Sequence, residues 1–208
     1  MRVEKPDFES KLKKAKAYIA DHREEEAIEL LETLLESRPW AVQVQHLLCT
    51  LYLDTGRTDI PSAWVAGAIK EEPAVRENMM KATIRFLQDE ELEKSNDIIR
   101  SLVWADPGSA EAWALLGSIR FRIGDLWTAE KALLQTLNLD PGDSEATVQL
   151  IRLYKELEQP ERALDIARDA LQAGGEPSPE YAGMLAEALE PLALEEIDHC
   201  LAWTQETS

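Results

Sequence analysis

The 208-residue sequence is poor in cysteine and glycine, and it contains no long apolar segment. Its two cysteines, Cys49 and Cys200, are too few for a disulfide framework and suit a reducing compartment. No run of about 18 apolar residues is present, which argues against direct membrane insertion. The N-terminus also lacks the apolar core of a signal peptide. We therefore expect a cytoplasmic protein.

The sequence is also short of positive charge. It has 22 Lys and Arg residues against 40 Asp and Glu residues, which gives a formal net charge of −18 at pH 7. A surface this acidic repels phosphate backbones and anionic lipid headgroups, so we expect neither nucleic acid nor a membrane as a partner. What the sequence does contain favours helices, because Leu, Ala and Glu are abundant.

Prolines recur at a spacing of 34 residues, at Pro39, Pro73, Pro107 and Pro141, and the next step reaches Gly175. Three further columns keep this spacing: one is aromatic in four of its five copies, one is mostly small and one is apolar. This agreement indicates an internal repeat with five copies. The three columns are Tyr18, Tyr52, Phe86, Arg120 and Tyr154; Ala27, Pro61, Ser95, Ala129 and Ala163; and Leu31, Val65, Ile99, Leu133 and Ala167.

Each copy is expected to form two helices. In the fourth copy, Trp113 and Leu116 begin one apolar stripe, and Ala129 and Leu133 begin a second at helical spacing. The prolines end each pair, because the residue before a proline disfavours the helical conformation. Small residues let two helices approach closely where they cross. Pro61 occupies the small column of the second copy, and we expect it near the start of its helix.

These residues resemble the tetratricopeptide repeat (TPR) family, whose 34-residue pattern is W-x2-L-G-x2-Y, then A-x3-F, then P. The fourth copy departs from that pattern at Arg120 and Leu133. The second copy keeps the aromatic Tyr52, and the first has Lys11 where an apolar residue is usual, which fits an N-terminal cap. The matching residues of the fourth copy are Trp113, Leu116, Gly117, Ala129 and Pro141.

The resemblance implies an all-α fold, a right-handed α-solenoid of about five TPR helix pairs with a C-terminal capping helix pair. The TPR array covers residues 1–177, and capping helices cover 178–208, with a degenerate sixth repeat as the alternative for this last segment. The repeats are expected at approximately 8–41, 42–75, 76–109, 110–143 and 144–177.

In the TPR family the first helix of each pair lines a concave groove that binds partners. The corresponding stripe is apolar in the middle of the array and basic at both ends. It predicts a groove for a protein or peptide segment with apolar anchors and acidic flanks. Packing of these residues within the superhelix, or cover by the chain's own tail, is the alternative. The predicted groove residues are Leu12, Lys16, Ile19, His46, Leu47, Thr50, Leu53, Met80, Lys81, Ile84, Leu87, Leu115, Ser118, Phe121, Arg122 and Arg152.

Within this set, two groups have different expected roles. The anchors are Leu53, Met80, Ile84, Leu87 and Phe121, and the cations that attract acidic flanks are Lys16, Lys81, Arg122 and Arg152. The two-Lys, two-Asn, Arg cluster of chaperone-binding TPR proteins does not occur at the matching positions.

Residues for catalysis or metal binding are scarce. His46 and Cys49 lie three residues apart, but two ligands are too few for a metal site, and Cys49 falls in a packing column. The acidic run at 23–29 is explained by a helix N-terminus. We therefore predict no enzyme, no metal and no cofactor. The expected function is a protein-interaction module, acting as adaptor, scaffold or chaperone, and the alternative is self-assembly into a homo-oligomer through groove or tail helices.

Three tryptophans fall near turns or outer faces, namely Trp40, Trp104 and Trp127. We expect two of the three to be buried, because buried Trp is the common case. An exposed cluster would instead mark a second contact surface.

Overall fold

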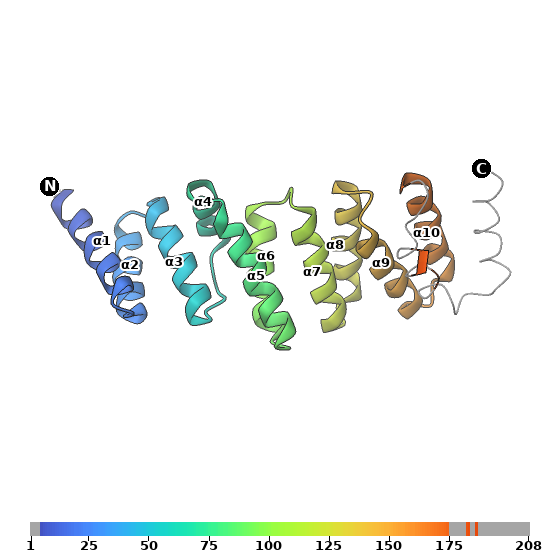
Figure 1. The fold of residues 1–208 in the computed structure, drawn as a ribbon, viewed down its shortest axis with the longest axis horizontal. Helices are drawn as coiled ribbons and strands as arrows, with labels where there is room; N and C mark the ends of the chain where they lie inside the picture. The colour runs from blue at the N-terminus through green and yellow to red at the C-terminus, as the bar shows by residue number, and fades with distance from the viewer. Residues whose placement is uncertain (1–4, 175–181, 184–185, 187–208) are drawn as a thin grey trace. The chain divides into compact units, whose positions relative to one another are not determined.

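The computed structural model describes residues 5–174, 182, 183 and 186, and all regular structure in this part of the chain is helical. Ten helices are present there, and each odd-numbered helix packs on the next to form a pair (Figure 1). The pairs are α1 (Lys5–Ala20) with α2 (Glu24–Ser37), α3 (Val42–Thr55) with α4 (Ser62–Glu71), α5 (Ala74–Gln88) with α6 (Leu92–Ala105), α7 (Ala110–Ile123) with α8 (Leu126–Leu139), and α9 (Ser144–Glu156) with α10 (Pro160–Gly174). This arrangement of helix pairs confirms the predicted fold class.

The chain divides into two compact units, Met1–Pro107 and Gly108–Ser208. Unit 1 contains α1 to α6, and unit 2 contains α7 to α10. The division falls beside the predicted boundary between the third and fourth repeats. The capping helices predicted over 178–208 lie outside the described residues, apart from Ala182, Gly183 and Ala186. The right-handed sense of the solenoid stays a prediction.

The ends of the helices repeat with the period of the prolines. Each second helix ends two residues before the proline of its copy, at Ser37, Glu71, Ala105 and Leu139. After each of these helices, the next backbone N–H donates to the carbonyl four residues earlier, as Asp106 does to Leu102 at 2.8 Å. The prolines therefore close the helix pairs, as the sequence predicts.

The turn inside each pair is also repeated. One residue per turn adopts a left-handed backbone with φ between 54° and 87°, and the following N–H donates to the carbonyl of the aromatic column. Arg23 donates to Tyr18 in this way at 2.9 Å, and Gln159 donates to Tyr154 at 2.8 Å. This geometry satisfies the free carbonyls at the C-terminus of each first helix. The left-handed residues are His22, Gly56, Glu90, Gly124 and Glu158.

Acidic and hydroxyl side chains start several helices. The first turn of α2 carries Glu24, Glu25 and Glu26, so the acidic run at 23–29 begins a helix as predicted. In unit 2, Ser109 Oγ accepts a hydrogen bond from the Ala112 N–H at 3.2 Å and caps α7.

The small columns lie where helices cross. Ala27, Ala129 and Cys49 are fully buried, which confirms Cys49 as a core residue. Burial raises the pKa of the Cys49 thiol to about 12, so the thiol stays protonated and unreactive at neutral pH. A Cβ added at Gly117 would lie 2.6 Å from Leu133 Cγ, so α7 and α8 meet too closely there for any larger residue.

The second copy departs from this regularity at α4. The other second helices begin 34 or 68 residues apart, at Glu24, Leu92, Leu126 and Pro160, which places the expected start of α4 at residue 58. Instead, α4 begins at Ser62, with Pro61 at its N-cap, so Pro61 does lie at the start of its helix. The first turn is replaced by residues 58–61, where Ile60 is buried.

The prediction for the outer tryptophans was wrong. Trp40, Trp104 and Trp127 are 75%, 77% and 66% exposed, so none of the three is buried. All three lie at helix ends: Trp40 in the turn before α3, Trp104 at the penultimate position of α6, and Trp127 in the first turn of α8. Helix ends extend beyond the crossing points where neighbouring helices cover each other. The exposed Trp127 ring makes a cation–π contact with Lys131, whose Nζ is 3.3 Å from the ring centroid.

Candidate functional site

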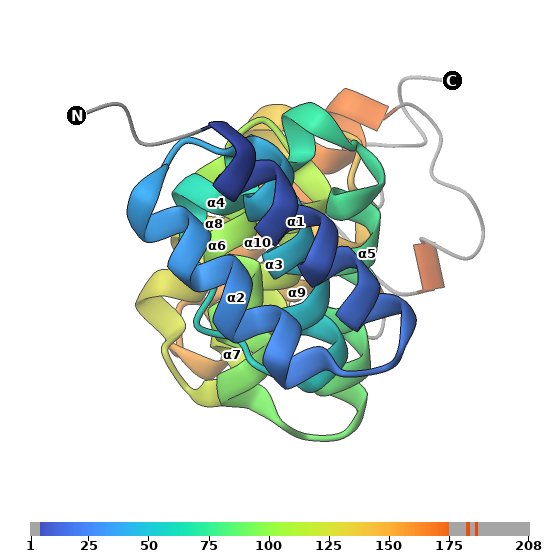
Figure 2. The ribbon, with the colours of Figure 1, turned by 90° about the vertical axis from the view of Figure 1, so that its left-hand side faces the viewer.

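In unit 1, the first helices α1, α3 and α5 lie toward one side and the second helices α2, α4 and α6 toward the other (Figure 2). Between α3 and α5 there is a pocket of about 310 Å³. From α3 it is lined by Thr50, Leu53 and Asp54, and from α5 by Asn78, Lys81, Ala82 and Arg85. Of the predicted groove residues, Thr50, Leu53 and Lys81 come together here.

Two cations on α5 give this pocket its chemistry. Lys81 Nζ lies 2.6 Å from Glu77 Oε1, one helical turn away, and both side chains are about two-thirds exposed. The Lys81 ammonium holds the pKa of the Glu77 carboxyl below its usual value through this hydrogen bond. The Arg85 guanidinium donates to the Leu53 carbonyl at 3.4 Å and so lies across the pocket toward α3. The pocket can therefore bind an acidic or other hydrogen-bond-accepting group.

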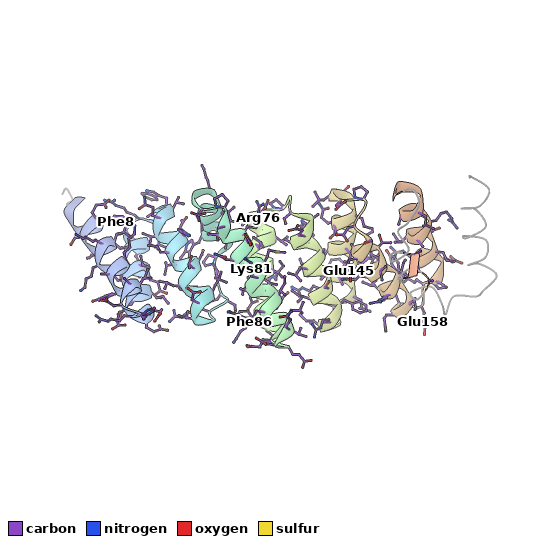
Figure 3. All side chains as sticks on the ribbon, viewed as in Figure 1. Phe8, Arg76, Lys81, Phe86, Glu145 and Glu158 are labelled. Atoms are coloured by element: carbon purple, nitrogen blue, oxygen red, sulfur yellow. The ribbon has the colours of Figure 1, made fainter. Side chains whose placement is uncertain are left out.

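An apolar stripe runs along α5 beside these cations. Ile84 is 42% exposed, and Met80 and Leu87 are half-buried at positions four before and three after it. Figure 3 shows Lys81 near the middle of α5, between Arg76 and Phe86. One face of α5 thus presents apolar and cationic groups together.

The other predicted groove residues of unit 1 differ in exposure. Leu53 is only 6% exposed and forms the wall of the pocket, and Leu12 is also buried. Lys16 is exposed, whereas Ile19, His46 and Leu47 are half-buried. Leu53 and Leu12 therefore pack within unit 1 and present little side-chain surface to a partner.

In unit 2, the predicted groove residues lie on α7 and α9. Ser118 Oγ donates to Gln149 Oε1 at 2.6 Å, and Gln149 Nε2 donates to Glu145 Oε1 at 3.0 Å, so a polar chain joins the two helices. Phe121 is half-buried and packs against the core, and Leu115 is half-buried as well. Arg122 and Arg152 are exposed. Figure 3 marks Glu145 at the α9 end of this chain.

The sequence interpretation missed four residues of the α3–α5 pocket, namely Asp54, Asn78, Ala82 and Arg85. Asn78 lies three residues before Lys81, and Arg85 lies four residues after it. Residues at these spacings share one face of a helix, so the sequence could have indicated both. The repeat pattern gave no sign that Arg85 is accessible. The residues at the same position in the neighbouring copies, Leu51 and Ile119, are apolar and buried.

Within residues 5–174, no group of three or more His, Cys, Asp or Glu side chains is arranged to hold a metal ion. Nor does any described helix combine the length and apolar character needed to span a bilayer.

The comparisons with known proteins concern the fold. No family model and no curated protein matches the sequence. Solved structures do match. TTC0263, a thermophilic TPR protein of Thermus thermophilus, has 20% identity and a TM-score of 0.50, with 88% of this chain and 99% of that chain covered. The Yersinia enterocolitica type III secretion chaperone SycD, in complex with a peptide of the translocator YopD, has 15% identity and a TM-score of 0.53, with 58% and 93% covered.

A third solved structure, the CopN–Scc3 complex, matches with 24% identity and a TM-score of 0.51, covering 60% of this chain and 72% of that chain. Together with the 34-residue period and the five helix pairs, these similarities show that the chain has the TPR fold.

Proposed function

We propose that the protein is a non-enzymatic protein-interaction module of the cytoplasm, an adaptor or chaperone that binds a helix or extended segment of a partner protein. The observation that carries the proposal is the face of α5, where the exposed Ile84 lies beside the Lys81 and Arg85 cations of the α3–α5 pocket. An apolar anchor and a cationic pocket on one helix face suit a segment with an apolar side chain followed by an acidic one.

The size and composition of the pocket support a peptide as the ligand. A volume of about 310 Å³ is at the lower end for a small-molecule site and accommodates one or two side chains. Arg85 is already oriented by the Leu53 carbonyl, which lowers the entropy lost when it binds an acidic group. The structure of SycD with a peptide of YopD supports the proposal, since it shows a peptide complex on a similar fold.

The first experiment compares three baits in a pull-down from native lysate: wild type, Ile84→Glu and Leu134→Glu. Leu134 on α8 is the matched control, because it is 39% exposed against 42% for Ile84 and receives the same substitution. We expect a partner that wild type and Leu134→Glu retain and Ile84→Glu loses. Its affinity should also fall about fivefold or more with Lys81→Glu, measured by titration calorimetry.

Circular dichroism of each bait checks that it remains helical. Equal capture by all three baits would contradict the proposal. Light scattering at two protein concentrations tests the alternative, self-assembly. A mass that rises with concentration for wild type and stays constant for Ile84→Glu would mean that the groove binds a second copy of the chain.

A further inference from the structure

The missing first turn of α4 leaves a second pocket, on the side of unit 1 formed by the second helices. It has a volume of about 470 Å³, and its lining includes Thr58 and Asp59 from the segment that replaces that turn. Thr58, Asp59 and Ser62 line it from the α3–α4 connection and the start of α4. From α6 it is lined by Asp97, Arg100, Ser101 and Trp104.

Hydrogen bonds hold the connection against α6 and keep the pocket open. Ser101 Oγ donates to the Ile60 carbonyl at 2.6 Å, and Thr58 Oγ1 donates to Asp97 Oδ2 at 3.5 Å. The Ile60 side chain is buried and anchors the same segment. The backbone of the α3–α4 connection is therefore held in place on α6 before any ligand arrives, which lowers the cost of binding.

Four of the lining side chains have no protein partner in the described part of the chain, and three of them are exposed to solvent. Asp59, Ser62, Arg100 and Trp104 make no hydrogen bond, ion pair or ring contact there. Trp104 is also 77% exposed, the highest value among the large hydrophobic residues that the structure describes as exposed. Trp and Arg are among the residue types enriched in interface hot spots, and the pocket contains one of each.

The charges decide what the pocket prefers. The lining contains two carboxylates, Asp59 and Asp97, and one guanidinium, Arg100, so it is negative overall. The whole chain also carries a formal charge of −18. This field attracts cations and repels phosphate or carboxylate ligands.

We propose that this pocket binds an Arg or Lys side chain presented by a protein partner. The cation lies on the face of the Trp104 indole, and its N–H groups donate to the carboxylates of Asp59 and Asp97. The Arg100 guanidinium then donates to backbone carbonyls of the same partner segment. The proposal does not depend on the α3–α5 pocket, since the two pockets share no lining residue.

The test uses the indole N–H resonances of the ¹⁵N-labelled full chain. Trp104→Phe identifies the Trp104 resonance, and Trp127→Phe identifies that of Trp127, an exposed tryptophan outside the pocket. The probes are tetra-arginine amide and tetraglutamate, titrated at about 0.15 M salt to screen non-specific attraction. We expect saturable movement of the Trp104 resonance with tetra-arginine alone, while the Trp127 resonance stays in place.

Charge-matched variants separate the pocket from the general acidity of the chain. Asp59→Asn with Asp97→Asn should weaken tetra-arginine binding roughly tenfold, since two charge-assisted contacts are lost. The control, Glu29→Gln with Glu36→Gln on α2, removes the same charge at exposed positions away from the pocket and should leave the affinity within about twofold.

The amide introduced by Asp97→Asn keeps an oxygen that accepts the bond from Thr58, so the double variant retains this contact. Asp59→Asn alone, at an exposed unpaired residue, provides a second variant that leaves the loop contacts intact. Equal weakening by the pocket and control variants would overturn the proposal. So would an unmoved Trp104 resonance, or its movement by tetraglutamate, which would assign the pocket to an anionic ligand.

Discussion

At the scale of single residues, the turn inside each helix pair imposes the sharpest local demand. All five copies require a left-handed residue there, yet only Gly56 and Gly124 are glycines. Side chains with a Cβ adopt this conformation at a cost of about 1–2 kcal/mol. The turn tolerates Glu90 because the hydrogen bond from the Glu91 N–H to the Phe86 carbonyl, 2.8 Å long, fixes the chain around it.

We predict that Glu90→Gly stabilises the protein by about 0.5–1 kcal/mol, because it removes the Cβ strain at a positive φ. The control is Glu29→Gly, an exposed glutamate in the interior of α2, which should destabilise by about 1 kcal/mol. Urea unfolding followed by circular dichroism measures both. Destabilisation of similar size by the two substitutions would show that the left-handed residue carries no strain.

The sequence predicted single residues well where the repeat dictates burial. Cys49 and Ala129 occupy small columns and are fully buried. It predicted them less well where exposure depends on the ends of helices, as for Trp104. The sequence also predicted Leu53 as an anchor, whereas in the structure Leu53 forms a wall of the pocket. Helical spacing places a side chain on a face of its helix, but it does not show how closely the next helix covers that side chain.

At the scale of elements, tyrosines of the aromatic column link neighbouring helices. Tyr52 on α3 donates to Glu32 on α2 at 2.5 Å, and Tyr154 on α9 donates to Glu130 on α8 at 2.9 Å. Burial and then the neighbouring carboxylate raise the pKa of each tyrosine to about 12. Both helix contacts therefore favour the protonated phenol.

This linkage predicts a loss of stability at high pH. Because the folded-state pKa exceeds the unfolded value near 10, the contribution is complete below pH 10 and disappears as the pH rises through 12. We expect Tm to fall more steeply between about pH 10 and 12 for wild type than for Tyr52→Phe with Tyr154→Phe. Thermal unfolding at several pH values measures this, and parallel curves for the two proteins would contradict it.

The late start of α4 is also an element-scale feature. The start of α4 could be predicted from Pro61, because proline lacks the backbone N–H that a position inside a helix needs. The pocket that results could not be predicted, since it depends on how Thr58 and Ser101 hold the connection on α6.

At the scale of the whole molecule, excess negative charge opposes the folded state. The chain has a formal charge of −18, so folding brings many carboxylates closer together and increases their mutual repulsion. Salt screens this repulsion. We predict that Tm rises by several degrees between low salt and about 0.5 M NaCl. Glu29→Gln with Glu36→Gln, which removes two exposed charges from α2, should reduce that rise. A Tm that is constant or falls with salt would contradict the prediction.

The sequence by itself determined the TPR fold and its helix pairs, because both follow from short-range rules that recur every 34 residues. Prolines end helices, small residues permit close crossings, and apolar stripes set the buried faces. Only the tertiary structure decided which stripe residues stay accessible, how Arg85 reaches across to α3, and that a pocket opens beside Trp104. These features depend on the packing of residues from different repeats, and a periodic pattern describes only what the repeats have in common.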